Sequence, residues 1–244
     1  MKISIITTVY NNKQHIEKAI LSVLSQTYHD IEYIVIDGGS SDGTVDVIKK
    51  YSNKIDKFIS EPDKGIYDGL NKGINLASGD VIGFLHSDDE YYDSKVIEKI
   101  VAKFNDDSID GVYGDLIYVN QKEEIVRYWK SGEFTPGKLK KGWMPPHPTL
   151  FLRKEIYDKY GLFRLDYKIA ADYDFMLRVL KHDPKLVYIP EILYKMRLGG
   201  ASNKSIKNIL QKTKEDYKAI TENKIGGVFT LINKNFSKLK QFKK

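Results

Sequence analysis

Short apolar runs alternate with segments of helical periodicity over the first 90 residues. Between the runs, apolar residues recur every three or four positions, as at Ile16, Ile20 and Leu24, which predicts a helix that begins near Asn12. Strands are expected at Ile3–Thr8, Glu32–Ile36, Asp56–Ser60 and Asp80–Leu85, and further helices through Val45–Tyr51 and Tyr67–Ala77. Strands that alternate with helices of this length predict right-handed crossovers and a parallel sheet.

After Asp93 the order of the elements changes. The pattern predicts helices at Lys95–Phe104, Lys154–Tyr160 and Asp172–Lys181, and strands at Val112–Val119, Ile125–Trp129, Leu150–Leu152, Leu186–Ile189 and Ile192–Met196. A long loop, Ser131–Pro148, lies between the strands predicted at Ile125–Trp129 and Leu150–Leu152. Loops of this length are uncommon unless they are functional.

The last forty residues predict a basic helix and a shorter helical segment at Val228–Ile232. The helix carries the apolar residues Ile206, Ile209, Leu210 and Tyr217, and Gly199–Ser202 before it has the composition of a hinge. We therefore expect a main domain over residues 1–200 and a basic C-terminal helical tail over residues 201–244.

The composition is that of one folded α/β domain with an appendage, since the chain has 244 residues and 41% hydrophobic content. It has no cysteine, which excludes disulfides and thiolate metal sites. No window approaches 18 consecutive apolar residues, and no signal peptide is recognisable at the N-terminus. These features predict a cytoplasmic protein.

The positive charge is concentrated in the tail. From Lys204 to Lys244 there are eleven Lys against three acidic residues, whereas the whole chain has a net charge of +6. A basic tail on a near-neutral body predicts an anionic partner, either a membrane surface or a polyanion. Only five of the 39 basic residues are Arg, which argues against a sequence-specific nucleic-acid reader.

Polar and acidic residues follow the predicted strands at one edge of the sheet. Thr7–Asn11, Asp37, Glu61–Lys64 and the pair Asp88 and Asp89 all stand at carboxyl ends, where ligands bind in open parallel sheets. Paired carboxylates together with a diphosphate hold a hard divalent cation. An isolated Asp pair can also do no more than cap a turn, but its position at a strand end favours a metal site.

Five segments in this order resemble family 2 glycosyltransferases of the GT-A fold, over roughly residues 1–200. They are Ile5–Asn12, Ser22–Tyr28, Asp37–Thr44, Glu61–Gly73 and Ala77–Asp80. The chain is most similar to bacterial members that build O-antigen and capsular polysaccharide. The resemblance implies a Rossmann-like, mostly parallel central sheet flanked by helices, with a nucleotide-sugar half over residues 1–93 and an acceptor half over residues 94–200.

The resemblance also implies a donor site. The base and ribose of the nucleotide would be contacted by Thr8, Val9, Tyr10 and Asn11. Asp37 would accept a hydrogen bond from the uracil ring, or would hold the loop that contacts uracil. The nucleotide and diphosphate side would be lined by Lys64, Gly65 and Asp68.

The family's metal motif reads Asp-x-Asp-Asp, whereas this chain has His86, Ser87, Asp88 and Asp89. We expect no metal contact from His86. Asp89 is the first choice as a ligand of Mn²⁺ or Mg²⁺, and Asp88 is the second, with a further contact to ribose or sugar.

The family pattern places a general base at Asp172, with Ala171 where a second acid often stands. An Asp that opens a helix is also a favoured capping residue, so the local residues alone leave both roles open. Asp174 is expected to be a cap or an ion-pair partner.

Three further residues are expected near the acceptor or the diphosphate. His147 would bond to sugar or phosphate or else stabilise its loop, and Trp143 would stack on a sugar or else fill a hydrophobic gap. Arg197 and the Gly199–Ser202 segment resemble a mobile loop that closes over the diphosphate and excludes water.

Together with these residues, the resemblance implies an inverting transfer of a hexose or N-acetylhexosamine from a UDP-sugar to the hydroxyl of a saccharide or of an undecaprenyl-diphosphate-linked acceptor. A sugar-phosphate nucleotidyltransferase is the alternative enzyme, but it needs a Gly-rich loop where this chain has Thr8–Asn12. A non-catalytic nucleotide-sugar-binding protein is the other alternative. Such a protein would be expected to lack Asp89 or Asp172, whereas this chain has both. The Lys- and Phe-containing segment Lys234–Lys244 predicts peripheral binding to the inner face of an anionic membrane, with a solvated tail as the alternative.

Overall fold

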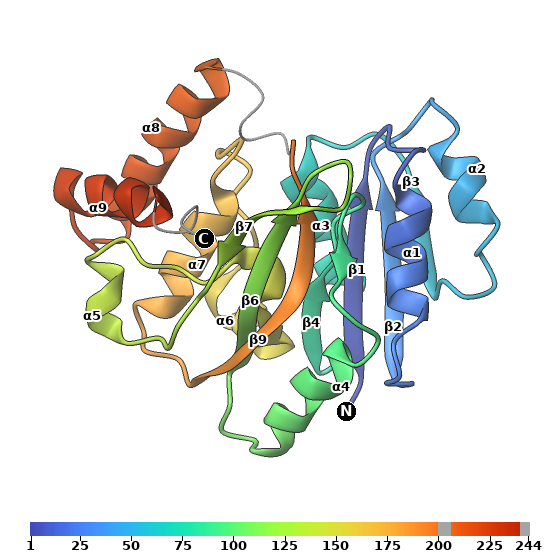
Figure 1. The fold of residues 1–244 in the computed structure, drawn as a ribbon, viewed down its shortest axis with the longest axis horizontal. Helices are drawn as coiled ribbons and strands as arrows, with labels where there is room; N and C mark the ends of the chain where they lie inside the picture. The colour runs from blue at the N-terminus through green and yellow to red at the C-terminus, as the bar shows by residue number, and fades with distance from the viewer. Residues whose placement is uncertain (200–205, 240–244) are drawn as a thin grey trace.

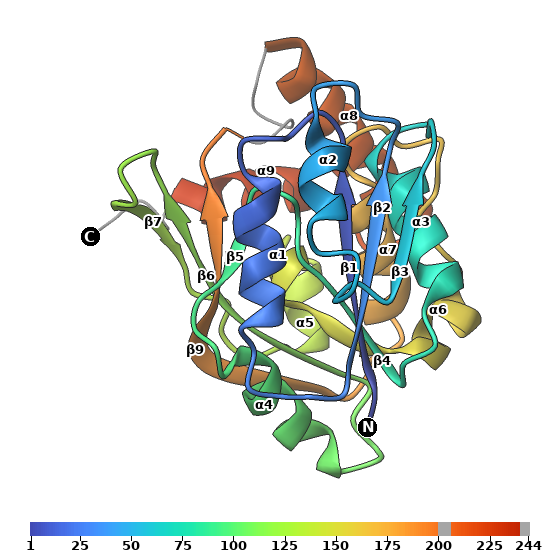
Figure 2. The same ribbon diagram turned by 90° about the vertical axis from the view of Figure 1, so that its right-hand side faces the viewer.

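Within residues 1–199 and 206–239, which the computed structural model describes, a nine-stranded sheet separates two layers of helices (Figure 1). The helices α1 and α2 cover one face, and α3, α6 and α7 cover the other (Figure 2). The α/β class expected from the sequence, with a sheet flanked by helices, is confirmed.

The N-terminal half of the sheet is parallel. Its strand order is β3-β2-β1-β4, and its strands are β1 (Ile3–Val9), β2 (Ile31–Asp37), β3 (Lys57–Ser60) and β4 (Val81–Phe84). The connecting helices are α1 (Ile16–Leu24), α2 (Thr44–Lys49) and α3 (Ile66–Leu76). β1 is buried at every residue, as expected for a strand covered on both faces.

The first helix begins later than the sequence predicts, at Ile16 rather than near Asn12. The carbonyl of Asn12 accepts from the backbone N–H of His15 at 3.2 Å, so these residues form a turn. The Asn12 side chain instead donates to Ser87 Oγ at 2.9 Å. Asn12 therefore joins two loops of the sheet edge rather than capping a helix.

The second half of the sheet has mixed directions, because β8 and β5 run antiparallel to their neighbours. Its strands are β5 (Glu90–Tyr91), β6 (Gly111–Val119), β7 (Ile125–Trp129), β8 (Phe151–Arg153) and β9 (Leu186–Arg197). Its helices are α4 (Val96–Val101), η1 (Ala102–Asn105), α5 (Pro136–Leu139), η2 (His147–Thr149), α6 (Lys154–Tyr160) and α7 (Ala171–Leu180).

The two strands predicted around Pro190 form one strand, β9. Its pairing with β6 shifts register between Tyr113 and Asp115, which pair with Tyr188 and Ile192. Pro190 lies in the skipped stretch, where a missing N–H removes no ladder bond. The prediction of a break was wrong because a bulge accommodates the proline.

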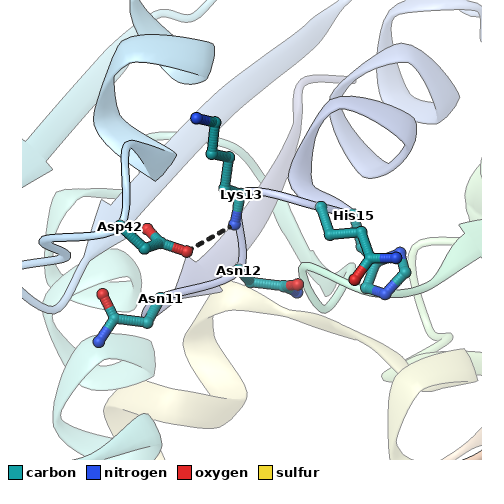
Figure 3. Close-up of a pocket in the computed structure, with 6 residues that line it drawn as sticks. Asn11, Asn12, Lys13, His15 and Asp42 are labelled. Carbon is teal, nitrogen blue, oxygen red and sulfur yellow. Dashed lines mark hydrogen bonds between the residues drawn. The ribbon is translucent and has the colours of Figure 1, made fainter.

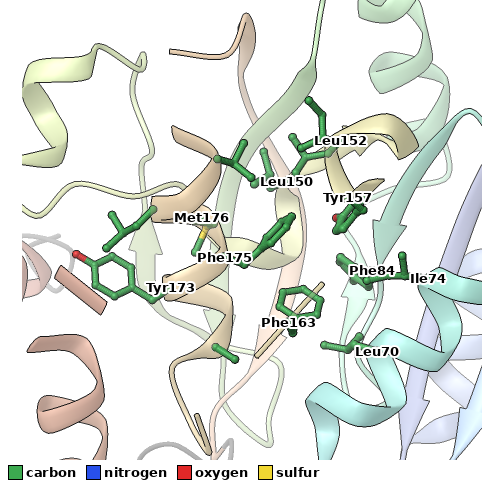
Figure 4. Close-up of a cluster of buried hydrophobic side chains, with 14 of the residues drawn as sticks. Leu70, Ile74, Phe84, Leu150, Leu152, Tyr157, Phe163, Tyr173, Phe175 and Met176 are labelled. Carbon is green, nitrogen blue, oxygen red and sulfur yellow. The ribbon is translucent and has the colours of Figure 1, made fainter. Parts of the chain in front are cut away.

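Aromatic side chains fill the core between the sheet and α3, α6 and α7 (Figure 4). The rings of Tyr157 and Phe175 stack with centroids 4.9 Å apart. Helix α3 lies close to β1 because of Gly73, where an added Cβ would stand 2.4 Å from Ile6 Cγ2. This close contact brings the start of α3 to the carboxyl edge of the sheet.

The C-terminal region forms two helices, α8 (Ile206–Glu222) and α9 (Val228–Leu239), which lie beside α7 (Figure 1). Ala219 and Ile220 of α8 are fully buried in the core. Residues 200–202 of the expected hinge lie outside the described residues. No helix in the described part of the chain combines the length and apolar character needed to cross a membrane.

Candidate active site

The turn that holds Asp88 and Asp89 lies between β4 and β5. Because β5 pairs with the end of β9, Asp89 lies beside Arg197, whose backbone N–H donates to Asp89 Oδ1 at 2.9 Å. Asp89 is only 2% exposed. Its burial, together with the neighbouring charge of Asp88, raises the pKa of Asp89 well above its usual range.

Asp88 differs from Asp89 in its surroundings. It is half-buried, and among the described residues no hydrogen bond or ion pair engages its carboxylate. Its charge nevertheless acts on the pKa values of His15 and His86, so both imidazoles lie near it. Asp88 is thus the carboxylate of the pair that remains available to a ligand.

The donor set of this turn fits a hard divalent cation. The described residues contain no group of three or more His, Cys, Asp or Glu side chains that could hold a metal by themselves. Mg²⁺ and similar ions usually take one or two carboxylates and complete their shell with phosphate oxygens and water. An available carboxylate at Asp88, backed by Asp89, meets that requirement.

The end of β1 and the loop after it combine buried and exposed residues of the predicted donor site. Thr8 and Val9 are buried, whereas Tyr10 is 65% exposed. Asn11 has a φ of +46°, and its side-chain oxygen accepts from the Ser41 backbone N–H at 2.9 Å. The β1 and β2 loops are therefore linked to each other.

Asp37 is fully buried at the end of β2 and holds its own loop. Its Oδ2 accepts from the backbone N–H of Gly39 and Ser40 and from Ser60 Oγ at 2.6 Å. Its Oδ1 is buried and has no partner among the described residues. Thr8 Oγ1 is likewise buried without a partner. Two orphaned polar atoms at this edge are consistent with a ligand that supplies their hydrogen bonds.

Lys64, Gly65 and Asp68 lie together where α3 begins. The Lys64 backbone N–H donates to Asp68 Oδ2 at 3.1 Å, and Asp68 also faces Lys72 at 3.7 Å. Lys64 and Gly65 are exposed. Asp68 thus stabilises the turn, while the Lys64 ammonium is left in solvent at the sheet edge.

Asp172 is the second residue of α7 and is half-buried. The Tyr67 hydroxyl lies 3.1 Å from Asp172 Oδ1 and 2.6 Å from the carbonyl oxygen of Ile169. Tyr67 belongs to α3, so this contact connects the N-terminal half of the sheet to α7. Asp174, two residues on, pairs with Arg178 at 2.9 Å, which confirms its expected ion-pair role.

Two histidines lie between the two acidic positions. The rings of His86 and His147 are 6.3 Å apart, and the charge of Asp172 acts on both. Burial lowers the pKa of His147 to about 4 and also lowers that of His86, so both imidazoles are neutral near pH 7. His86 Nδ1 and His147 Nε2 are buried without a partner among the described residues.

Trp143 and Arg197 are held by protein contacts. The Trp143 ring stacks on Phe134 at 5.4 Å, and its Nε1–H donates to the Ser131 carbonyl at 2.8 Å. This arrangement is that of a residue filling a hydrophobic gap. The Arg197 guanidinium pairs with Glu123 at 3.0 Å.

The structure adds residues that the sequence did not single out. One is His15, which lines an open pocket with Asn11, Asn12, Lys13, Gln14 and Asp42 (Figure 3). Another is Tyr67, which stands inside the recognised Glu61–Gly73 segment, so its motif was a signal that could have identified it. A third is Glu215 of α8, which accepts from the backbone N–H groups of Lys168, Ile169 and Ala170 just before α7. No local pattern marks Glu215.

Comparison with known proteins gives one family and one fold. The family model described as glycosyl transferase family 2 matches residues 4–185. A PGL/p-HBAD biosynthesis glycosyltransferase of Mycobacterium tuberculosis is 28% identical over 82% of this chain and 78% of its own length. An uncharacterized glycosyltransferase of Rickettsia typhi is 31% identical over 89% of this chain and 70% of its own.

Solved structures agree with the fold. S. aureus TarS has a TM-score of 0.73 at 18% identity, over 97% of this chain, which spans only 44% of TarS. The mannosyltransferase PcManGT from Pyrobaculum calidifontis, in complex with GDP-Man and Mn²⁺, has a TM-score of 0.70 at 14% identity. It matches 96% of this chain and 69% of its own.

Proposed function

The chain belongs to glycosyl transferase family 2, and we propose that it moves a hexose or N-acetylhexosamine from a UDP-sugar to a saccharide hydroxyl, with inversion. The observation that carries this proposal is that the charges of Asp88 and Asp172 both act on His86, whose ring lies 6.3 Å from that of His147. A carboxylate suited to the donor diphosphate and a carboxylate suited to a general base thus border one site.

For the donor, TarS supplies a parallel, since it was solved with UDP and with UDP-GlcNAc. The orphaned Asp37 Oδ1 would accept the ring N–H of uracil, and Thr8 Oγ1 would bond to the nucleoside. Tyr10 would cover the base, and Lys64 would offer a positive charge to the diphosphate.

The diphosphate end of the donor would lie at Asp88. The sequence put Asp89 before Asp88 as a metal ligand, but Asp89 is buried and accepts the Arg197 backbone N–H, so we propose the opposite order. Asp88 would be the principal protein ligand of Mn²⁺ or Mg²⁺, and Asp89 would support the turn from behind. When bound, the cation would stabilise the negative charge that develops on the departing UDP.

Asp172 would act as the general base. It would take the proton of the acceptor hydroxyl as that oxygen attacks the anomeric carbon opposite the diphosphate. Tyr67 would fix the orientation of the Asp172 carboxylate, and the neutral His86 and His147 would bond to sugar hydroxyls through their orphaned nitrogens. No protein nucleophile is required.

The acceptor would be a saccharide on a lipid diphosphate, used for cell-surface polysaccharide. It would enter beside the Ser131–Pro148 loop, which contains His147. This assignment places the chain on the cytoplasmic side, at the inner face of the membrane.

Calorimetric titration with UDP tests the donor site. We expect Mn²⁺ to strengthen UDP binding, and Asp88→Asn to weaken binding in Mn²⁺ by about tenfold or more because one ligand charge is lost. Asp46→Asn, on the exposed face of α2, is the matched control. UDP affinity that is indifferent both to Mn²⁺ and to Asp88→Asn would refute the proposed site. A donor screen scored by UDP release on a synthetic lipid-diphosphate sugar then identifies the sugar.

A further inference from the structure

Helix α9 presents its apolar residues to solvent. Four of them form the α9 face, namely Val228, Phe229, Ile232 and Phe236, with exposures of 54%, 84%, 42% and 65%. Residues three, four and seven positions apart share one side of a helix, so these side chains form a continuous stripe.

The side of α9 that faces the protein carries the polar residues Thr230 and Lys234, together with Leu231, which packs against the core. Lys234 is 2% exposed, with its Nζ 2.5 Å from Asp216 Oδ1 and 3.5 Å from the centre of the Tyr173 ring. Thr230 Oγ1 donates to the carbonyl of Lys140 at 2.9 Å. The sequence suggested that Lys234 belongs to an exposed basic segment, and this was wrong, because a buried carboxylate pairs with it.

An ordinary surface helix buries its apolar stripe, whereas α9 buries Thr230 and Lys234 beside Leu231 and leaves four other apolar side chains exposed. Burying a lysine has a desolvation cost even when it is paired, and exposing two phenylalanines leaves their surface in water. Because the ion pair with Asp216 fixes the rotation of α9, the helix cannot turn its apolar stripe inward. The part of the chain that the structure describes leaves the α9 face uncovered, so the face is available to a partner.

The positive charge of the C-terminal region that carries the stripe indicates what covers it. Lys207, Lys214 and Lys224 are exposed on α8 and between α8 and α9. The sequence continues with Lys238, Lys240, Lys243 and Lys244. Two copies of this surface would repel each other, whereas an anionic bilayer would attract it and accept the apolar side chains.

We propose that the α9 face lies on an anionic lipid bilayer, with Phe229 and Phe236 inserted at the boundary of headgroups and acyl chains. The inference deepens the proposed function and rests on it only for the identity of the acceptor.

The position of α9 gives this contact a use. Its backbone at Lys234 lies against Gly142 of the Ser131–Pro148 loop, where an added Cβ would stand 2.6 Å from Lys234 N. Lys234 also contacts Tyr173, the neighbour of Asp172 in the chain. In Figure 1, α9 lies beside α5 of that loop and away from α2 and β3. A bilayer on the α9 face would thus present a lipid-linked acceptor on the side of Asp172.

Co-sedimentation of the full chain with vesicles tests the proposal. We expect binding to vesicles of phosphatidylglycerol and phosphatidylcholine in equal parts, and much weaker binding to phosphatidylcholine alone. The double substitution Phe229→Ser with Phe236→Ser should weaken binding by about tenfold or more, since two inserted aromatic side chains are lost. Leu21→Ser, which removes a 48% exposed side chain of α1, should bind as the wild type does.

Two further measurements separate the outcomes. The double variant should unfold at the same temperature as the wild type, which shows that a loss of lipid binding is not a loss of fold. It should also bind UDP as the wild type does, so that the donor site is tested separately from the α9 face. Equal vesicle binding by the double variant and the wild type would overturn the proposal. The proposal would also be overturned if light scattering showed the wild type to be a dimer and the double variant a monomer, because a second copy of the chain would then cover the α9 face.

Discussion

At the scale of single residues, the two carboxylates that border His86 have different environments and therefore different proposed tasks. Asp88 has no partner among the described residues, whereas Asp172 is oriented by the Tyr67 hydroxyl at 3.1 Å. A metal ligand needs free lone pairs, and a general base needs a fixed direction towards the proton that it removes.

Asp172→Asn tests the base directly. The amide keeps the size of the side chain but cannot take a proton, so we expect kcat to fall by about 10²- to 10⁴-fold. The affinity for UDP should be unchanged, because Asp172 does not contact the nucleotide in the proposed site. Steady-state UDP release and calorimetry measure the two quantities.

Asp158→Asn, on the exposed face of α6, provides the comparison for that experiment. An Asp172→Asn enzyme with the kcat of the wild type would leave Asp172 with a structural role only, as the acceptor of the Tyr67 hydroxyl. The base would then have to be sought elsewhere in the site.

The positions of individual site residues were predictable where a local motif surrounds them. Asp37, Asp88 and Asp172 each stand at the end of a strand or the start of a helix, and these positions follow from apolar periodicity. The inward orientation of Lys234 was not predictable. It depends on Asp216 from another helix, and a pattern of Lys and Phe residues is the same whichever side of α9 faces the protein.

At the scale of elements, α8 supports the start of α7. The carboxylate of Glu215 accepts three consecutive backbone N–H groups, those of Lys168, Ile169 and Ala170, immediately before the helix that carries Asp172. Ala170, at the N-cap position, has no side chain that could supply such a bond. The cap of α7 therefore comes from a different helix.

Glu215→Ala should destabilise the fold by about 2–3 kcal/mol, because buried N–H groups lose a charged acceptor. It should also lower kcat more than UDP affinity, since the segment before Asp172 loses its support. Urea unfolding measures the first effect and steady-state kinetics the second. Glu215→Gln, which keeps one acceptor oxygen, should recover part of both losses.

The same contact predicts that the stability contributed by Glu215 depends on pH. Burial acts to raise the pKa of Glu215, but the bonds from Gln211 and the three backbone N–H groups outweigh it, so the pKa is lowered. A carboxylate whose pKa is lowered in the folded state stabilises the fold fully at pH values above its pKa in the unfolded chain, about 4.3. This stabilisation is lost as the pH falls through the pKa of the folded state. The stability difference between wild type and Glu215→Ala should therefore narrow below about pH 4. A constant difference from pH 7 to pH 3 would contradict this role.

Elements were predicted well where burial alone determines them, and less well where tertiary contacts set their ends. The strand β1 is buried throughout, so its apolar run identifies it. Asn12 is of a residue type that often caps a helix, but its side chain bonds to Ser87, which lies in a distant loop. Helix α1 begins four residues later, at Ile16. Pro190 lies within β9 because the pairing with β6 shifts register there.

At the scale of the whole molecule, distant segments meet at the site through a few specific contacts. Tyr67 links the N-terminal half of the sheet to α7, and Glu215 and Lys234 link the C-terminal helices to α7. The proposed donor site and the proposed base are therefore positioned relative to each other by the packing of the entire chain. The α9 face is attached to the same network.

This network bears on whether residues 1–200 can act without the C-terminal helices. Ala219 and Ile220 are fully buried, and Asn223 donates to the buried Asp174 at 3.0 Å. A chain that ends at Gly199 would expose the surface that these side chains cover and would leave the cap of α7 unfilled. Burial of a side chain such as Ile220 contributes about 1.5–3 kcal/mol, and with the lost cap of α7 the total is several kcal/mol.

We therefore expect the chain that ends at Gly199 to melt roughly 10 °C or more below the full chain, since about 1 kcal/mol corresponds to about 2–4 °C at this size. A chain that ends at Leu239 keeps α8 and α9 and should melt with the full chain. Differential scanning fluorimetry with and without UDP measures both. If the chain that ends at Gly199 were as stable as the full chain and as active on a water-soluble acceptor, α8 and α9 would be a dispensable attachment. The positioning of Asp172 would then have to come from the core of residues 1–199 alone.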